Sequence, residues 1–383
     1  MVLGAVIALG LIIGMQIPLM HPRSHDRLTL HLPARTAPAL AWPQGGSAAL
    51  VVPSLGIAQS HHNVVLPIAS LTKMMTAYVV LKKLPLTLGQ TGPCLTVTSS
   101  DVATYQSMIQ SDQSNALVSV GEQLCEFDLL DGLLVHSANN YSVLLADMVA
   151  GNPTNFVALM NTTAASMGLV GTHYVDTSGF ATGSVSTALD QGLLAERLMQ
   201  SPLIRFIVGQ SSVTLPIAGT LGSYTPFVGV DHVVGVKSGR TSAAGGCDVM
   251  AMQFVDGTST RTVYSVVLDQ RGGNLLGPAG QAALALAQSA VTPERMLQFM
   301  KGRIVGRLGW SALTAIVVGR SSSFHWWPAQ GNVPVTARID HFSSTVRRGE
   351  RVGWLYVHAA TLRRIPLVAS STISPPSLWQ RLR

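Results

Sequence analysis

The stretch SLTKMMTAYVVLKK at residues 70–83 is the most informative part of the 383-residue chain. Pro67 precedes it and Pro85 follows it, as expected for a helix that begins after one proline and ends before the next. Ser70 and Lys73 are three positions apart, so they lie one helical turn apart on the same face. The sequence therefore predicts a helix over residues 70–83 that holds a hydroxyl and an amine side by side.

Such a pair is suited to nucleophilic catalysis. A serine hydroxyl is a poor nucleophile until a neighbouring base takes its proton. A lysine is that base only if its pKa is lowered by burial, by a second cation or by the positive end of a helix. Ser-x-x-Lys also occurs by chance, with the serine as a helix cap and the lysine solvated, so the pair needs support from other motifs.

Two further motifs follow downstream. Ser137-Ala138-Asn139 comes after an apolar stretch at residues 129–135, and Lys237-Ser238-Gly239 comes after a strand expected to end at residue 236. We expect the first motif in a loop and the second at a strand end. Asn139 and Ser238 have an alternative reading as plain turn residues. Three such motifs in this order indicate an active site.

The order and spacing of these motifs resemble the penicillin-binding-protein and serine β-lactamase superfamily. The neighbouring residues look like the low-molecular-mass, serine-type D-alanyl-D-alanine carboxypeptidases: ASLTKMMTAY at 69–78, LLDGLL at 129–134, FVALMN at 156–161, DTSGF at 176–180 and STALD at 186–190. The similarity spans about residues 47–290. Lys-Ser-Gly replaces the family's usual Lys-Thr-Gly, and Thr177 replaces its usual proline.

The resemblance and the chemistry together imply roles for five residues. Ser70 is the nucleophile, Lys73 is its general base, and Ser137 relays the proton to the leaving amine. Asn139 holds Lys73 and the substrate amide by hydrogen bonds. Lys237 adds a positive charge that favours a neutral Lys73.

Substrate binding is expected around the third motif. The backbone N–H groups of Ser70 and Arg240 are the expected donors to the oxyanion. The candidate substrate-binding residues are Ser238, Gly239, Arg240, Thr241 and Arg271. Either Arg240 or Arg271 is the cation expected to bind the substrate's terminal carboxylate.

The implied activity is removal of the terminal D-alanine from a peptidoglycan pentapeptide through an acyl-enzyme, without metal or cofactor and with inhibition by β-lactam antibiotics. One alternative is a serine β-lactamase, which usually needs a glutamate between the second and third motifs. The only glutamate there is Glu196, in a helix expected at 193–199. A second alternative is a catalytically idle scaffold that binds the cell wall.

The pattern of elements predicts an α+β fold, in which helices flank an antiparallel sheet with an inserted helical region and a small all-β domain follows. Strands are expected near residues 47–52, 228–236, 248–254 and 262–268, and helices near 117–124, 129–135, 154–167 and 278–290. The expected parts are a membrane anchor or signal segment at 1–20, a linker at 21–45, a catalytic domain at 46–292, a β domain at 293–371 and an amphipathic tail at 372–383.

Charge and cysteine content limit the partners. The net charge is +7 with no nucleic-acid motif, which favours an anionic membrane or cell-wall surface as a partner. The family resemblance implies a location at the extracytoplasmic face of a bacterial cell membrane, either anchored or secreted. Cys94 and Cys125 form either a disulfide or two free thiols, and Cys247 is unpaired. The His61-His62 pair and His136 are expected as solvated or loop residues, since no carboxylates stand at metal-ligand spacing.

Overall fold

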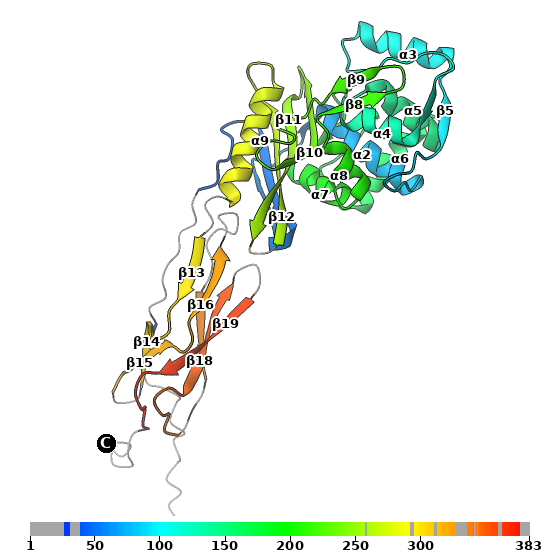
Figure 1. The fold of residues 1–383 in the computed structure, drawn as a ribbon. Helices are drawn as coiled ribbons and strands as arrows, with labels where there is room; N and C mark the ends of the chain where they lie inside the picture. Colours follow the sequence, from blue (N-terminus) through cyan, green and yellow to red (C-terminus); the bar gives the residue numbers. More distant parts are fainter. Residues whose placement is uncertain are drawn as a thin grey trace, which may run out of the picture. The chain divides into compact units, whose positions relative to one another are not determined.

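The computed structural model describes residues 27–30, 39–256, 259–291, 295–309, 312–326, 335–340, 342, 344–358 and 362–375. The predicted anchor or signal segment at 1–20 and most of the predicted tail lie outside these residues. The chain divides into two compact units, the larger formed by Pro38–Glu294 with Trp327–Gly331 and the smaller by Met1–Ala37, Arg295–Trp326 and Asn332–Arg383. Figure 1 labels their elements.

A five-stranded antiparallel sheet forms the centre of the larger unit, in the order β10-β11-β12-β2-β3. The strands are β2 Ser47–Val52, β3 Ile57–His61, β10 Val233–Thr241, β11 Gly245–Asp256 and β12 Ser259–Gln270. Every residue of β2 is buried, because both faces of this sheet are covered. β10 is an edge strand, so only one side of its backbone pairs with another strand of this sheet.

The helix α9, Leu276–Val291, covers one face of this sheet (Figure 1). Ala279, Ala283 and Ala287 recur at helical spacing and are fully buried against the strands. Small side chains allow the helix to lie close to the sheet, and Ser265 of β12 donates a hydrogen bond to the Ala283 carbonyl at 2.7 Å. This face is therefore tightly packed and almost wholly apolar.

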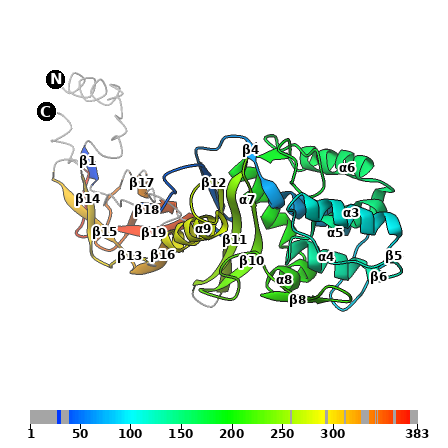
Figure 2. The same ribbon diagram turned by 90° about the horizontal axis from the view of Figure 1, so that it is seen from above.

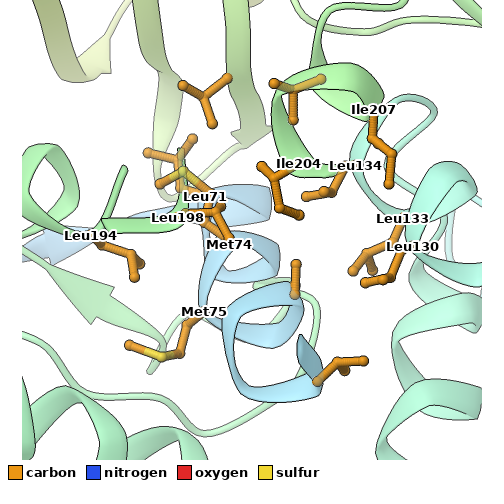
Figure 3. Packing of buried hydrophobic residues seen from close by; sticks show 14 of the residues in the cluster. Leu71, Met74, Met75, Leu130, Leu133, Leu134, Leu194, Leu198, Ile204 and Ile207 are labelled. Carbon is orange, nitrogen blue, oxygen red and sulfur yellow. The ribbon is translucent and has the colours of Figure 1, made fainter. Parts of the chain in front are cut away.

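A layer of helices lies on the other side of the sheet, as Figures 1 and 2 show. They are α2 Thr72–Lys83, α3 Ser99–Gln110, α4 Glu126–Leu134, α5 Asn139–Ala150, α6 Pro153–Ser166, α7 Ala188–Leu198 and α8 Pro202–Val208. α2 is buried almost all round, which is typical of a core helix. In Figure 3, Leu71 and Met74 pack beside Leu198 and Ile204.

The helix predicted over residues 70–83 is confirmed, although its first turn, Ala69–Leu71, is a 3-10 helix. The helix predicted over residues 117–124 is wrong. Ala116 and Val118 are buried whereas Leu117 and Val120 are exposed, an alternation typical of extended chain rather than of a helix.

Extended chain continues after that segment. Gln123–Cys125 forms β6, which pairs with β5, Cys94–Thr96. Cys94 lies directly opposite Cys125, and the two form a disulfide. Cys247 is a free, buried thiol. The short strands β4 Leu66–Pro67, β7 Val185–Ser186, β8 Ser212–Leu215 and β9 Gly219–Gly222 complete the unit.

The strand predicted over residues 228–236 is shifted in the structure. β10 begins at Val233, after Asp231 and His232, whose φ angles of 50° and 64° are incompatible with a strand. It then continues through the Lys237-Ser238-Gly239 motif to Thr241, because these residues pair with β11. The motif therefore lies inside the strand and not at its end.

The smaller unit is all-β. Its six-stranded sheet has the order β1-β14-β15-β19-β18-β17, and β13 pairs with β16. The strands are β1 Arg27–Leu30, β13 Arg295–Phe299, β14 Ile304–Gly309, β15 Thr314–Val318, β16 Ser322–Trp326, β17 Val335–Ile339, β18 Arg351–His358 and β19 Leu362–Ala369. Leu308, Ile316 and Leu355 are fully buried in its core.

The predicted linker at residues 21–45 requires a correction. Arg27–Leu30 forms the edge strand β1, because all four residues pair with β14. The α+β class and the all-β unit that follows it are confirmed. Among the described residues, no single helix is long and apolar enough to span a membrane, and only α5 and α6 taken together, bent by 84°, meet that criterion.

Candidate active site

Ser70 stands in the 3-10 turn that leads into the buried helix α2. The Lys73 Nζ atom lies 2.9 Å from the Ser70 Oγ atom, within hydrogen-bond distance. Ala69 has a φ of 47°, a strained value for a residue with a side chain. A Cβ atom on Gly179 would lie 1.7 Å from the Ala69 carbonyl oxygen, so only glycine fits where that loop crosses the turn.

Lys73 is fully buried and makes two further hydrogen bonds. Its Nζ atom donates to Asn139 Oδ1 at 2.6 Å and to the Ser178 carbonyl at 3.0 Å. Burial, and then the charge of Lys237, hold the pKa of Lys73 well below its usual range, while Asp176 acts in the opposite direction. The free amine that a general base requires is therefore favoured here.

Ser137 lies in the loop between α4 and α5 with a φ of 63°. Its Oγ atom is buried and has no hydrogen-bond partner within the described part of the chain. Asn139, two residues later, is the first residue of α5. The second motif thus places one unengaged hydroxyl and one amide at the start of a buried helix.

Gln113 is a site residue that sequence reasoning missed. Its Oε1 atom accepts a hydrogen bond from Asn139 Nδ2 at 2.6 Å, so Asn139 is held from both ends of its amide. The loop that carries Gln113 is tied to α5 by Asn140, which bonds both the N–H and the carbonyl of Ala116. Nothing in the sequence indicated this contact, because it joins residues 26 positions apart across a loop without secondary structure.

Asp176 is a second residue whose role the sequence did not indicate. Its carboxylate accepts hydrogen bonds from the backbone N–H groups of Gly179, Phe180 and Ala181 and from two serine hydroxyls. These bonds hold the loop that presents the Ser178 carbonyl to Lys73. Thr177, in the place of the family's usual proline, accepts a hydrogen bond from Thr76 of α2 at its carbonyl.

A hollow of about 400 Å³ is lined by Gln113, Ser178 and Phe180 among others.

β10 brings the third motif to the nucleophile. A Cβ atom on Gly239 would lie 2.6 Å from the Ser70 backbone nitrogen, so this strand passes against the turn with no room for a side chain. Lys237, two residues earlier and therefore on the same face of the strand, is fully buried and donates to the Ser238 carbonyl at 2.8 Å. Burial lowers the pKa of Lys237 to about 7, and the charge of Asp248 opposes this shift.

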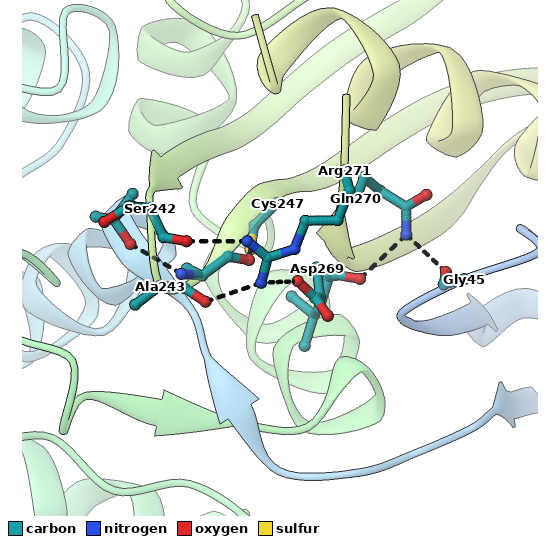
Figure 4. Close-up of polar contacts among 10 residues, drawn as sticks. Gly45, Ser242, Ala243, Cys247, Asp269, Gln270 and Arg271 are labelled. Carbon is teal, nitrogen blue, oxygen red and sulfur yellow. Dashed lines mark hydrogen bonds and ion pairs between the residues drawn. The ribbon is translucent and has the colours of Figure 1, made fainter. Parts of the chain in front are cut away.

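Three of the remaining candidate substrate-binding residues already have hydrogen-bond partners within the protein. Ser238 Oγ donates to the Tyr224 carbonyl at 2.8 Å, and Thr241 Oγ1 accepts from the Ala244 N–H at 3.0 Å. Arg271 donates to the Ser242 and Ala243 carbonyls at 2.9 and 3.1 Å and pairs with Asp269 (Figure 4). The Arg271 guanidinium is therefore already hydrogen-bonded to the turn between β10 and β11.

Arg240 is exposed beside the motif, and no hydrogen bond or ion pair with another described residue engages its guanidinium. Arg240 and Arg271 were the two alternatives for the carboxylate-binding cation. Within the described residues, the structure gives partners to the Arg271 guanidinium and none to that of Arg240. His136 lies in the bend after α4, where its Nδ1 atom is 3.0 Å from the Gly222 carbonyl oxygen. In the described ranges, no three His, Cys, Asp or Glu side chains gather as a metal site would require.

Comparison with known proteins shows which family carries these three motifs. A model of the D-alanyl-D-alanine carboxypeptidase family, peptidase family S11, matches residues 56–272. The chain belongs to this family. It is therefore a serine-type D-Ala-D-Ala peptidase, and the family match spans all three motifs.

Two relatives of this family member carry different activities in their names. A D-alanyl-D-alanine endopeptidase of Pseudomonas aeruginosa is 32% identical over 222 residues, covering 55% of this chain and 66% of its own length. The D-alanyl-D-alanine carboxypeptidase DacD of Escherichia coli is 27% identical over 331 residues, 82% of each chain. This chain spans about two thirds of the first relative's length.

The fold also matches solved structures of the family. Penicillin binding protein 5 from Haemophilus influenzae aligns with a TM-score of 0.61 at 18% identity, over 89% of this chain and 100% of the other. At that identity the match concerns the fold alone. It extends over both units of the chain.

Proposed function

We propose that this family member is a carboxypeptidase that removes the terminal D-alanine from peptidoglycan stem peptides through an acyl-enzyme on Ser70. The observation that carries the proposal is the 2.9 Å contact between Ser70 Oγ and a fully buried Lys73 whose pKa is depressed. The substrate class comes from the family to which the chain belongs.

In the first step, Ser70 Oγ attacks the carbonyl carbon between the last two D-alanines, and Lys73 Nζ takes the hydroxyl proton. The carbonyl oxygen becomes an oxyanion. The Ser70 N–H and the Arg240 N–H are the proposed donors to it, and the close approach of Gly239 to the Ser70 nitrogen supports this arrangement. A side chain at position 239 would block it.

In the second step, the C–N bond breaks and the leaving D-alanine nitrogen gains a proton. Ser137 Oγ is the proposed relay from Lys73, and its buried hydroxyl, unpaired within the described residues, is available for this transfer. Water then hydrolyses the ester, with Lys73 acting as base for a second time. Asn139 is held between Lys73 and Gln113 and fixes the position of the amine.

The carboxypeptidase activity is favoured over the endopeptidase activity by two observations. Arg240 offers an unengaged cation beside the third motif, and a carboxypeptidase has to bind a free terminal carboxylate. The carboxypeptidase relative also aligns over 82% of this chain, against 55% for the endopeptidase relative. We therefore assign the carboxylate to Arg240 and not to Arg271.

The β-lactamase alternative is disfavoured by the position of Glu196. This residue lies on α7, close enough to Tyr264 of β12 to act on its pKa, and none of the contacts made by Ser70 or Lys73 involves it. We propose that penicillins acylate Ser70 and that their esters persist, so β-lactam antibiotics act as inhibitors. The proposed location is the extracytoplasmic face of the cell membrane, where the peptidoglycan lies.

The test uses the full chain with a synthetic pentapeptide ending in D-Ala-D-Ala and with a cross-linked peptide dimer. We expect release of free D-alanine from the pentapeptide, none from Ser70→Ala, and labelling of the wild type alone by a fluorescent penicillin. Cleavage of the dimer without D-alanine release would replace the carboxypeptidase with an endopeptidase. Rapid nitrocefin turnover would establish a β-lactamase, and inactivity of a folded protein in all assays would favour the scaffold.

A matched pair of variants tests the carboxylate-binding cation. We expect Arg240→Gln to raise KM for the pentapeptide about tenfold or more, as for loss of one charge-assisted contact. Arg271→Gln removes contacts to the Ser242 and Ala243 carbonyls, so it should lower the melting temperature with a smaller effect on KM. The reverse pattern would assign the carboxylate to Arg271.

A further inference from the structure

Tyr224 contacts both the second and the third motif region, although it belongs to neither motif. It lies between β9 and β10, in a stretch of turns and bends. Its backbone N–H donates to the Val135 carbonyl at 3.1 Å, and its own carbonyl accepts a hydrogen bond from the Ser238 hydroxyl at 2.8 Å. Val135 caps α4 two residues before Ser137, and Ser238 is the middle residue of the third motif. The backbone of one residue therefore joins the two regions.

The ring of Tyr224 makes a third contact. It stacks on the imidazole of His136, with the ring centroids 4.8 Å apart and an angle of 28° between the planes. His136 directly precedes Ser137, and its Nδ1 atom faces the Gly222 carbonyl oxygen at 3.0 Å. A ring nitrogen at this distance from a carbonyl carries the hydrogen, so His136 is the donor. The stack and this hydrogen bond tie the turn before Ser137 to residues 222–224.

The two motifs have no hydrogen bond directly to one another within the part of the chain that the structure describes. The Ser137 hydroxyl has no partner, the Asn139 amide is bonded within the helical layer, and the Lys237 amine bonds a carbonyl of its own strand. Both motifs supply residues to the proposed mechanism, so their separation has to be held by residues outside them. Tyr224 is placed to do this, because each of its three contacts ends in a motif or within two residues of one.

The hydrogen bond from Ser238 also determines where the single proton of that hydroxyl lies. A serine hydroxyl donates one hydrogen bond, and the acceptor here is the Tyr224 carbonyl. A substrate carboxylate has only acceptor atoms, so Ser238 donates to it only after its hydrogen has turned away from Tyr224. The Tyr224 carbonyl is therefore the acceptor of this proton in the free protein, and it holds the Ser238 oxygen in place until substrate binds.

The stack contributes little to the hydrophobic core. The Tyr224 side chain is 40% exposed, and neither it nor His136 belongs to the buried apolar cluster of the larger unit or packs against it. A ring at the surface whose contacts all lead to the motifs suits a local role in positioning. Its removal should leave the protein folded, which makes the role testable.

We propose that Tyr224 is a positioning residue that fixes the second and third motifs relative to one another, with its stack on His136 as the contact that holds it in place. The proposal rests on the proposed acyl transfer at Ser70, and Tyr224 touches none of the reacting atoms. Without the stack, the turn before Ser137 and the Ser238 hydroxyl both lose a fixed partner. Catalytic groups have to be held to within about 0.5 Å, so the rate should fall more than the stability does.

The first test compares Tyr224→Ala with Tyr224→Phe in the full chain, by D-alanine release from the pentapeptide and by the rate of penicillin acylation. We expect Tyr224→Ala to lower kcat/KM and the acylation rate about two- to tenfold, which corresponds to the free energy of one aromatic stack. Tyr224→Phe keeps the ring and should behave as wild type. Phe206→Ala, at a ring of similar exposure on α8, is the control and should also behave as wild type.

Two results of this comparison would overturn the proposal. Wild-type rates in Tyr224→Ala would show that the stack positions nothing. A loss in Tyr224→Phe as large as that in Tyr224→Ala would assign the effect to the hydroxyl and not to the stacked ring.

A double-mutant cycle tests whether the stack is the contact that matters. His136→Ala removes the other ring together with the hydrogen bond to Gly222, so it should lower the same rates by at least as much as Tyr224→Ala. The double variant should lose no more than His136→Ala alone, because the stack is already absent there. Losses that multiply would mean that the two rings act independently, and this result would refute the proposal.

The melting temperature separates positioning from a merely structural role. A structural role would lower the melting temperature and leave kcat/KM of the folded protein unchanged, contrary to the proposal. If Tyr224→Ala does not fold, His136→Ala and His136→Phe give the same comparison from the other ring. A wild type that neither releases D-alanine nor is acylated would refute the proposed function and the role of Tyr224 with it, whereas an active wild type with unaffected variants would refute the role of Tyr224 alone.

Discussion

Lys73 on α2 and Lys237 on β10 are both fully buried lysines, but their surroundings differ. Lys73 hydrogen-bonds three groups from three separate segments: the Ser70 hydroxyl, the Asn139 amide and the Ser178 carbonyl. Lys237 donates to a carbonyl of its own strand, that of Ser238. The first environment positions an amine against a nucleophile, and the second holds a charge.

Their electrostatic neighbours differ in the same sense. Burial is the largest cause of the lowered pKa in both lysines, but the second influence on Lys73 is a cation and that on Lys237 is the carboxylate of Asp248. The comparison shows that burial alone does not decide the role of a lysine. The neighbouring charges act in opposite directions, because a cation disfavours the ammonium form of Lys73 while a carboxylate favours that of Lys237.

The largest effect is expected from removing the base. Lys73→Met should lower the second-order rate of penicillin acylation by about 100- to 10,000-fold, because Ser70 loses the group that takes its proton. Stopped-flow labelling measures this rate. Lys83→Met, at the exposed end of the same helix, is the control and should behave as wild type. Wild-type acylation in Lys73→Met would mean that another group is the base.

The next largest effect is expected from removing the cation. In Lys237→Met the pKa of Lys73 should rise because its positive neighbour is gone, so the acid limb of the acylation profile moves to higher pH. One pKa unit reduces the free amine about tenfold below that pKa, and the rate at pH 6 should fall accordingly. Lys237→Arg keeps the charge and should keep the limb. An acid limb unmoved in the methionine variant would contradict the coupling of the two lysines.

A smaller effect is expected at the amide that holds Lys73. Gln113→Ala removes the acceptor of Asn139 Nδ2, which frees the amide to rotate away from the amine. We expect kcat/KM for the pentapeptide to fall about two- to tenfold, the value of one hydrogen bond. Gln210→Ala is the matched control, since that glutamine bonds Asp131 and no residue of the site. Equal losses in both variants would indicate a general effect on packing.

The smallest effect is expected from replacing a carboxylate that is buried without a neighbouring cation. Glu126 is buried, neither carboxylate oxygen has a partner among the described residues, and burial raises its pKa to about 7. Because this folded-state pKa lies above the unfolded value of 4.5, its favourable contribution is present below that value and is lost as the pH rises towards 7.

Glu126→Gln should therefore raise the melting temperature at pH 8 and leave it unchanged at pH 4, where both side chains are neutral. Differential scanning calorimetry at the two pH values measures this difference. Equal melting temperatures for the two proteins at pH 8 would show that the carboxylate pays no cost for burial.

Much of the fold was predictable from local patterns. The helix at 70–83 and the helices near 154–167 and 278–290 follow from apolar periodicity bounded by proline or polar residues. The segment 117–124 misled because short apolar runs fit a helix or extended chain equally well. The pairing of β1 with β14 joins residues about 280 positions apart, and no local signal specifies such a contact.

The sequence by itself determined the three motifs, their order, and the Ser70–Lys73 pair, because residues one helical turn apart are neighbours in any helix. Only the tertiary structure decided that Gln113 holds Asn139, that Arg271 is committed to a turn while Arg240 is not, and that Asp248 lies beside the third motif. The reason is physical. Burial and through-space charge depend on segments that meet only when the chain folds.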